Sequence, residues 1–132
     1  MRKTLSVVAA ILVNENEEIL CALRSPRMSI PNRWEFPGGK VQEGETPAEA
    51  IEREINEELK CSIEAKDIFL TSHHDYDTFS IDLTAITCKL VEGFPTAHEH
   101  SKLIWLKREN LDSLKWAPAD VATVERLVKE SM

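Results

Sequence analysis

Three glutamates near the middle of the chain have a spacing that suits metal binding. Glu54, Glu57 and Glu58 stand at positions i, i+3 and i+4, and on a helix they would share one sector roughly 100° wide. Carboxylates this close repel one another by roughly a few tenths of a kcal/mol even when exposed. A hard divalent cation turns that repulsion into coordination, because Mg²⁺ prefers oxygen ligands and keeps several of its waters. Arg53, beside them, could brace the carboxylates without touching the metal.

A solvated acidic helix would carry the same three glutamates, and this simpler interpretation holds for most glutamate-rich helices taken alone. The residues before this helix weaken it. Gly38 and Gly39 allow a sharp backbone bend with little steric cost, and a glycine carbonyl can approach a metal ion closely. The glycines by themselves could be no more than a turn. The combination of the two features therefore indicates a magnesium site.

The order and spacing of seven residues resemble the signature of the Nudix hydrolases, G-x5-E-x7-R-E-U-x-E-E-x-G-U, where U is a bulky aliphatic residue. The matching residues are Gly39, Glu45, Arg53, Glu54, Ile55, Glu57 and Glu58. The segment 38–47 is similar to the MutT branch of that family. The segments 34–39, 97–100 and 117–120 look like stretches of bacterial CTP pyrophosphohydrolases and related nucleotide-pool cleansing enzymes. The sequence departs from the signature at its end, where Lys60 replaces the usual glycine and Cys61 the usual aliphatic residue.

The resemblance implies a fold and a metal site. The fold is α/β (α+β), a Nudix α/β/α sandwich with a central mixed sheet and flanking helices. The implied metal ligands are the carbonyl of Gly38 and the carboxylates of Glu54, Glu57, Glu58 and Glu99. Glu54 or Glu99 would also be the catalytic general base, and Arg53 would support the carboxylates. The implied cofactor is Mg²⁺, with Mn²⁺ able to replace it.

The same resemblance implies a small-molecule nucleotide as the substrate. Arg24 and Lys40 match positions that contact phosphates or support the signature, whereas Glu35, Phe36 and Asp120 match positions that line the nucleobase pocket. In the implied reaction a metal-bound water attacks a bridging phosphorus, and a nucleoside triphosphate is split into a monophosphate and pyrophosphate. The base stays open between CTP or dCTP and oxidised or methylated nucleotides.

Several of these side chains have simpler explanations. An aspartate such as Asp120 is equally expected at the start of a helix, because its charge suits the helix dipole. Phe36 and Trp34 could stack on a base, yet single aromatic residues are more often part of the core. The histidines at 73–74 and 98–100 lack the cysteine partners or helical spacing of a zinc site, which favours histidines that line a nucleotide pocket.

The apolar pattern predicts the elements that must position these groups. Strands are expected at 6–13, 18–24, 68–74, 78–92 and 103–106, and loops at 14–17, 25–33 and 93–100. In the strand at 78–92, apolar residues from Phe79 alternate with the polar residues Ser80, Asp82 and Thr84, which is typical of a half-buried antiparallel strand.

Two helices are predicted. The first begins after Thr46, where Pro47 and Glu49 complete a capping box. Its apolar face is expected to hold Ala48, Ile51, Ile55 and Leu59. The second is expected at 118–131, with one face formed by Val121, Val124, Leu127 and Val128.

Length and composition limit the class of protein. The 132 residues, 42% of them hydrophobic, are expected to form one domain over 1–132. A formal net charge of −7 argues against a basic surface for duplex nucleic acid. The apolar run 5–13 is too short to span a bilayer, so no membrane partner is expected. Three cysteines without metal-type spacing favour reduced thiols and a cytoplasmic location. Either a monomer or a homodimer is compatible with the sequence.

Two other functions are also compatible with the sequence. One is hydrolysis of a larger nucleoside diphosphate conjugate, such as a dinucleoside polyphosphate or a capped RNA 5′ end, although the short chain lacks an accessory domain for such substrates. The other is a regulator that binds nucleotides and hydrolyses nothing, since fold does not imply function. The presence of all the signature glutamates argues against a regulator.

Overall fold

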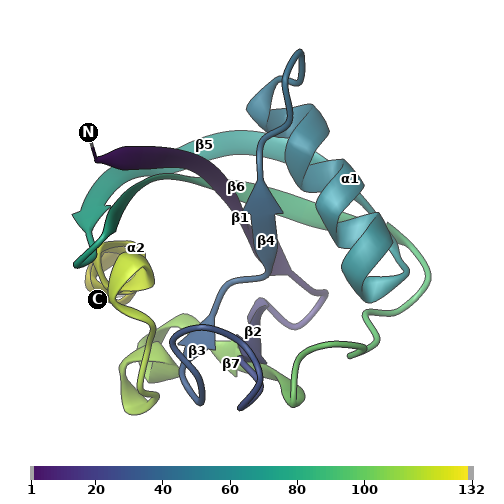
Figure 1. Ribbon diagram of the computed structural model, residues 1–132. Coiled ribbons are helices and arrows are strands. Elements are labelled where there is room, and N and C mark those ends of the chain that lie inside the picture. Colours follow the sequence, from purple (N-terminus) through teal and green to yellow (C-terminus); the bar gives the residue numbers. More distant parts are fainter. Residues whose placement is uncertain (1, 131–132) are drawn as a thin grey trace.

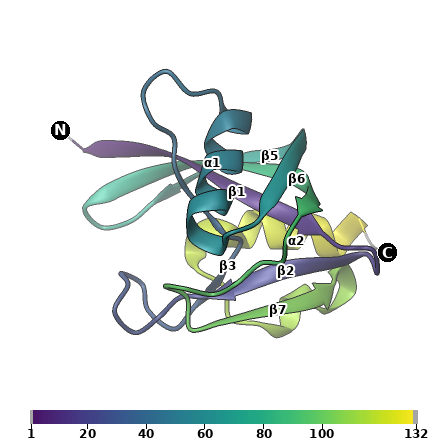
Figure 2. The same ribbon diagram turned by 90° about the vertical axis from the view of Figure 1, so that its right-hand side faces the viewer.

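The sheet at the centre of the protein is organised around its first strand. The computed structural model describes residues 2–130, and these form seven strands in one sheet with the order β3-β2-β1-β6-β5, while β4 pairs with β1 and β7 with β2. The strands are β1 (Lys3–Val13), β2 (Glu18–Leu23), β3 (Trp34–Glu35), β4 (Gly38–Lys40), β5 (Ser62–Asp75), β6 (Phe79–Glu92) and β7 (Lys102–Lys107). β1 pairs in parallel with β6 and antiparallel with β2 and β4, so the sheet is mixed. Figure 2 shows β2 and β7 as a pair set below the long strands.

Within residues 2–130, two helices and two short 3₁₀ turns accompany the sheet. They are α1 (Pro47–Leu59), α2 (Val121–Glu130), and the turns at Arg108–Ser113 and Pro118–Asp120. The helices cover opposite faces of the sheet because β1 is apolar on both sides, and successive strand residues point to opposite faces. Figure 1 shows α1 and α2 on either side of the long strands. The predicted α/β/α sandwich with a central mixed sheet is therefore confirmed.

The core consists of two clusters that β1 separates. Val8, Ala10 and Leu12 pack with the buried residues of α1. Ala9 and Ile11, on the other face, pack in the cluster that contains the buried residues of α2. A strand buried on both faces has to be apolar throughout, which explains why the run predicted at 6–13 shows no alternation.

Helix α1 begins as predicted. The Thr46 side chain accepts a hydrogen bond from the backbone N–H of Glu49, and the Glu49 carboxylate accepts one from the backbone N–H of Thr46. The buried face of α1 differs from the predicted one by one residue, because Ala48 is exposed and Ala50 is buried instead. The other three predicted residues, Ile51, Ile55 and Leu59, are buried.

The second helix is shorter than predicted. Pro118–Asp120 is a 3₁₀ turn, and α2 begins only at Val121; the predicted end at residue 131 lies outside the described residues. Because a 3₁₀ turn advances the chain by three residues rather than 3.6, the helical face is rotated. As a result Val121 is 40% exposed, whereas Thr123 is fully buried beside Val124 and Leu127.

Strands β5 and β6 also differ from the prediction. β5 begins at Ser62 rather than residue 68, because its polar first half pairs with β6 through backbone groups, with register shifts that disturb the alternation of side chains. β6 is antiparallel to β5 but parallel to β1. Its Ser80 is buried instead of facing solvent, and the hydroxyl donates to the Asp75 carboxylate.

The outer strand β5 is held by side chains from both helices. Glu52 of α1 accepts a hydrogen bond from the backbone N–H of Ala65 at 2.9 Å. Arg126 of α2 donates to the backbone carbonyl of Phe69, and its guanidinium carbon lies 4.2 Å from the centre of the Phe69 ring. Both helices therefore contact the backbone of the same strand.

Cys21, Cys61 and Cys88 are buried and free. Burial raises the pKa of the Cys21 and Cys88 thiols to about 12, so both stay protonated and unreactive near neutral pH. None of the helices within residues 2–130 has the length and apolar character needed to cross a membrane.

Lys60 ends α1 in the left-handed conformation that glycine adopts most easily. Its φ is 57° and its ψ 37°, so a side chain occupies the position at which the Nudix signature has glycine. We expect Lys60→Gly to raise the free energy of unfolding by roughly 0.5–1 kcal/mol, since a left-handed residue with a Cβ is strained. Urea unfolding measures this. Lys60→Ala keeps the Cβ and should give no gain; an equal gain from alanine would show that the charge, not the backbone, matters.

Candidate active site

Helix α1 presents its acidic side chains to an open cavity. The cavity has a volume of about 380 Å³ and is lined by Glu54, Glu57, Glu58, Lys60, His98 and Glu99. Three of the glutamates come from one turn of α1, while Glu99 comes from the loop between β6 and β7. The structure therefore brings together the four carboxylates that the sequence indicates as metal ligands, although 41 positions along the chain separate Glu58 from Glu99.

Arg53 braces this cluster from the side of the β4–α1 loop. Its guanidinium binds both carboxylate oxygens of Glu45, at 2.6 and 3.0 Å, and pairs with Glu54 at 3.0 Å and with Glu57 at 3.3 Å. It also donates to the backbone carbonyl of Lys40 at 3.0 Å. These bonds lower the pKa of Glu45 and raise that of Arg53, so the bracing cation keeps its charge.

Glu58 is the carboxylate most in need of a further partner. Its Oε2 atom is buried and has no hydrogen-bond partner. Burial, followed by the charge of Glu54, raises the pKa of Glu58 to about 7, while His100 opposes the rise. A buried carboxylate oxygen without a partner costs free energy, and a divalent cation beside it would remove that cost. The donor set at this cavity therefore fits a hard metal ion.

The two glycines before α1 are closely packed, Gly38 against another backbone and Gly39 against the end of a side chain. A Cβ atom on Gly38 would lie 1.9 Å from the backbone oxygen of Val8 in β1, and one on Gly39 would lie 2.4 Å from the carboxyl carbon of Glu54. Both glycines belong to β4, which pairs antiparallel with β1. They allow β4 to lie between β1 and the acidic face of α1, so the predicted bend is an approach of two backbones.

Within residues 2–130, no three acidic, histidine or cysteine side chains are already arranged around one point that could hold a metal ion. Glu54 and Glu57 are instead paired with Arg53. A cation would have to draw the exposed Glu57 and Glu99 side chains inward, which long flexible carboxylates can do at little cost in backbone rearrangement.

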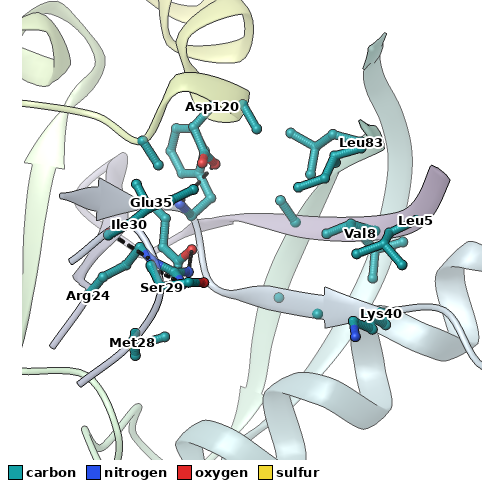
Figure 3. A pocket seen from close by; sticks show the side chains of 18 of the residues that line it. Leu5, Val8, Arg24, Met28, Ser29, Ile30, Glu35, Lys40, Leu83 and Asp120 are labelled. Carbon is teal, nitrogen blue, oxygen red and sulfur yellow. Dashed lines mark hydrogen bonds and ion pairs between the residues drawn. The ribbon is translucent and has the colours of Figure 1, made fainter. Parts of the chain in front are cut away.

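A second cavity continues from the acidic one. Its volume is about 350 Å³, and it extends from Gly38, Gly39, Lys40 and Glu58 to Asp120. The predicted substrate-binding residues Arg24, Glu35, Phe36, Lys40 and Asp120 all line it. Figure 3 shows Arg24, Glu35 and Asp120 on one side of this pocket, and Lys40 on the other side together with Val8 and Leu83. Glu58 lines both cavities, so they meet at that residue.

Arg24 is engaged by the protein itself. Its guanidinium pairs with Glu35 at 2.7 Å and donates to the backbone carbonyls of Ser29 and Ile30. The dashed lines in Figure 3 mark these bonds. Arg24 therefore fixes the loop at 25–33 against the pocket wall, while its role as a phosphate contact stays a prediction.

Asp120 lies buried at the end of the pocket, where it is 6% exposed. Burial, followed by the charge of Glu35, raises its pKa well above the ordinary value. The hydrogen bond that it accepts from the backbone N–H of Phe36, at 3.3 Å, opposes the rise only in part. A carboxyl group that keeps its proton offers both a donor and an acceptor to a bound base.

Phe36 is both a core residue and a part of the pocket wall. It is 2% exposed, and its ring packs against that of Trp116 with centroids 4.7 Å apart. The indole N–H of Trp116 donates to the backbone carbonyl of Leu111 at 2.7 Å, which holds the pair in place. The simpler explanation of Phe36 as a core residue is therefore correct, and stacking on a base stays a prediction for its cavity-facing part.

Two further residues near the pocket have partners that the sequence alone does not show. Tyr76 lines the pocket, and its hydroxyl accepts a hydrogen bond from the backbone N–H of Ala119 at 3.2 Å. His100 is buried and pairs with Glu35 at 2.7 Å. The signals were present, since Tyr76 is the one tyrosine of the chain and His100 belongs to the segment 97–100, but only the fold shows their partners.

The α/β/α sandwich, with the acidic helix α1 packed beside Gly38 and Gly39, indicates the class of protein. The family model described as the NUDIX domain matches residues 3–131. The chain therefore belongs to the NUDIX family, and the prediction of a Nudix hydrolase is confirmed.

Relatives and solved structures agree with this assignment. The chain is 30% identical over 125 residues to the 8-oxo-dGTP diphosphatase of Escherichia coli (strain K12), covering 95% of this chain and 97% of that protein. It is 32% identical over 123 residues to the CTP pyrophosphohydrolase of the same organism, covering 93% and 90%. A solved structure described as DNA mismatch repair protein MutT, of the Nudix hydrolase family, from methicillin-resistant Staphylococcus aureus 252 is 45% identical, with a TM-score of 0.79 over 98% of this chain and 99% of that one.

We expect Glu58→Gln to change how stability depends on pH in metal-free buffer. The folded-state pKa of Glu58 is about 7, above the ordinary value of 4.5, so between these values the folded protein binds more protons than the unfolded chain. Stability attributable to Glu58 is therefore lost as the pH rises from about 5 to about 8, by roughly 1 kcal/mol after allowance for partial exposure. Urea unfolding at several pH values should show that the free energy of unfolding depends less on pH in the glutamine variant. Parallel pH profiles for the two proteins would contradict the raised pKa of Glu58.

Proposed function

We propose that the protein hydrolyses nucleoside triphosphates to monophosphates and pyrophosphate, with Mg²⁺ as the cofactor and Mn²⁺ as a substitute. The observation that supports this most is the position of Glu58, whose buried and unpartnered carboxylate oxygen lies where the acidic cavity meets the nucleotide-sized pocket. A triphosphate whose base occupies the pocket would extend toward that junction. The reaction takes place where its phosphates meet the carboxylates.

The residues that would hold the metal are Glu54, Glu57, Glu58 and Glu99, together with the backbone carbonyl of Gly38. When bound there, the ions would neutralise charge on the phosphate oxygens and lower the pKa of a bound water. They would also overcome the repulsion between a polyphosphate and a protein of net charge −7. Lys40, which lines the pocket near the glycines, would add a positive charge on the protein's side.

Two carboxylates are candidates for the general base. Glu54 is held by Arg53 at 3.0 Å and lies directly behind Gly39, so its position is fixed before substrate binds. Glu99 is exposed on the loop between β6 and β7 and lines the same cavity. Either could take the proton from the attacking water, and the monophosphate would then leave from the pocket side.

The nucleobase would be recognised at the end of the pocket that holds Asp120, Phe36 and Tyr76. A protonated Asp120 can donate one hydrogen bond and accept another, which suits a base edge with adjacent acceptor and donor groups. The similar proteins from Escherichia coli are described as acting on 8-oxo-dGTP and on CTP. For this chain we propose CTP, dCTP or an oxidised or methylated nucleotide as the substrate, with the chain acting as a single domain.

We expect Glu57→Gln and Glu58→Gln to lower turnover by about 100-fold or more, because each removes a ligand whose metal contributes several kcal/mol to the transition state. Pyrophosphate release at saturating Mg²⁺ measures this. Glu125→Gln, an exposed change on α2 outside both cavities, is the matched control and should retain full activity. Near-normal turnover in either cavity variant would show that the ligands are assigned wrongly.

We expect Asp120→Ala to weaken the preference among bases. Losing a buried hydrogen-bonding partner costs about 1–3 kcal/mol, so kcat/KM for the preferred triphosphate should fall about 5- to 150-fold, while the poorer substrates change much less. A panel of canonical, methylated and oxidised triphosphates, each with and without Mg²⁺, gives the measurement. An equal fall for every base would make Asp120 a structural residue at the start of a helix.

A further inference from the structure

The loop that carries Glu99 is fixed at both of its ends. The backbone N–H of Thr96 donates to the carbonyl of Leu59 at the end of α1, at 3.0 Å, and the backbone N–H of Ser101 donates to the carbonyl of Leu23 in β2, at 2.9 Å. The residues at 96–99 between these points are exposed, whereas His100 is buried with a side chain that is 3% exposed. His100 is therefore the side chain through which this stretch is anchored in the protein.

The partner of His100 belongs to the wall of the nucleotide pocket. The Nε2 atom of His100 lies 2.7 Å from Oε2 of Glu35, and the other oxygen of Glu35 lies 2.7 Å from Arg24. Arg24 in turn donates to the carbonyls of Ser29 and Ile30. One continuous set of polar contacts therefore joins the loop at 25–33, the pocket wall and the residue next to Glu99.

We propose that His100 is a positioning residue, whose bond to Glu35 places the neighbouring Glu99 at the mouth of the acidic cavity. The inference rests on the proposed function, which gives Glu99 a role as metal ligand or general base. Adjacent Cα atoms are about 3.8 Å apart, so anchoring His100 restricts where the Glu99 backbone can lie. Without that anchor, the stretch between Thr96 and Ser101 would be held only at its ends, and the exposed Glu99 would sample many positions.

The same bond links base binding to chemistry. Glu35 lines the pocket in which the base would lie and contacts His100 with one oxygen. A base that contacts Glu35 would therefore act on His100, which is 65 residues further along the chain and positions Glu99. This gives a physical route by which a poorly fitting base lowers turnover and not only affinity.

Three substitutions of His100 test the proposal. His100→Gln places an amide N–H close to the position of Nε2 and is the matched control that keeps the bond to Glu35. His100→Leu fills a similar volume without a donor. His100→Asn stays polar but is one bond too short, and it serves in place of leucine if that variant does not fold.

We expect the leucine and asparagine variants to lower kcat by about 10- to 100-fold, as is usual when a group that orients a metal ligand is lost, with a smaller change in KM for the nucleotide. They should also raise the Mg²⁺ concentration at half-maximal rate, and glutamine should restore most of the rate. Wild-type kcat in leucine and asparagine variants, or a glutamine variant as impaired as these two, would overturn the proposal.

Hydrogen exchange of the substrate-free protein separates this inference from the proposed function. The amides at 97–99 should exchange faster in the leucine and asparagine variants than in the wild-type and glutamine proteins, while those of α1 stay unchanged. Unchanged exchange at 97–99 would overturn the positioning role. If the wild-type protein releases pyrophosphate from no nucleotide, the proposed function fails, and the exchange result still decides whether His100 orders the loop.

Discussion

The Arg53 guanidinium is the contact on which the geometry of the acidic face depends. Crowded carboxylates on one turn of a helix repel one another, and Arg53 offsets this through Glu45, Glu54 and Glu57 together. Because it also binds the carbonyl of Lys40, it joins α1 to β4, on which the two glycines lie. Through Arg53, the carboxylates of Glu54 and Glu57 are therefore linked to the backbone of β4 beside the cavity.

Hydrogen bonding and burial shift the pKa values of the acidic groups in opposite directions. The bonds to Arg53 lower the pKa of Glu45, which stays an anion, whereas burial raises the pKa of Glu58 to about 7 and that of Asp120 well above its ordinary value. The same side-chain chemistry thus gives one carboxylate that braces Arg53 and two buried carboxyl groups whose charged form is disfavoured. The differences arise from neighbours and solvent, which the fold controls.

Local signals made the first helix and its acidic face predictable, because a capping box, two glycines and glutamates at helical spacing all lie within some twenty residues. The start of the second helix was harder to predict from the sequence. The choice between a 3₁₀ turn and an α-helix after Pro118 depends on the tertiary packing of Asp120 and Thr123, which are both buried. Tyr76 and His100 find their partners 43 and 65 residues away. Contacts of that kind follow from the order of strands in the sheet, which side-chain periodicity does not encode.

Strand β5 lies at one end of the described sheet, opposite β3, and an open strand edge is a template on which another chain can pair. Here Glu52 and Arg126 occupy backbone groups of β5, and its register shifts disturb the regular ladder. Since these two side chains come from helices on opposite faces, the docking of α1 and α2 also protects the protein against intermolecular strand addition. A form that released either helix would leave backbone groups of this fourteen-residue strand open to pairing with another chain.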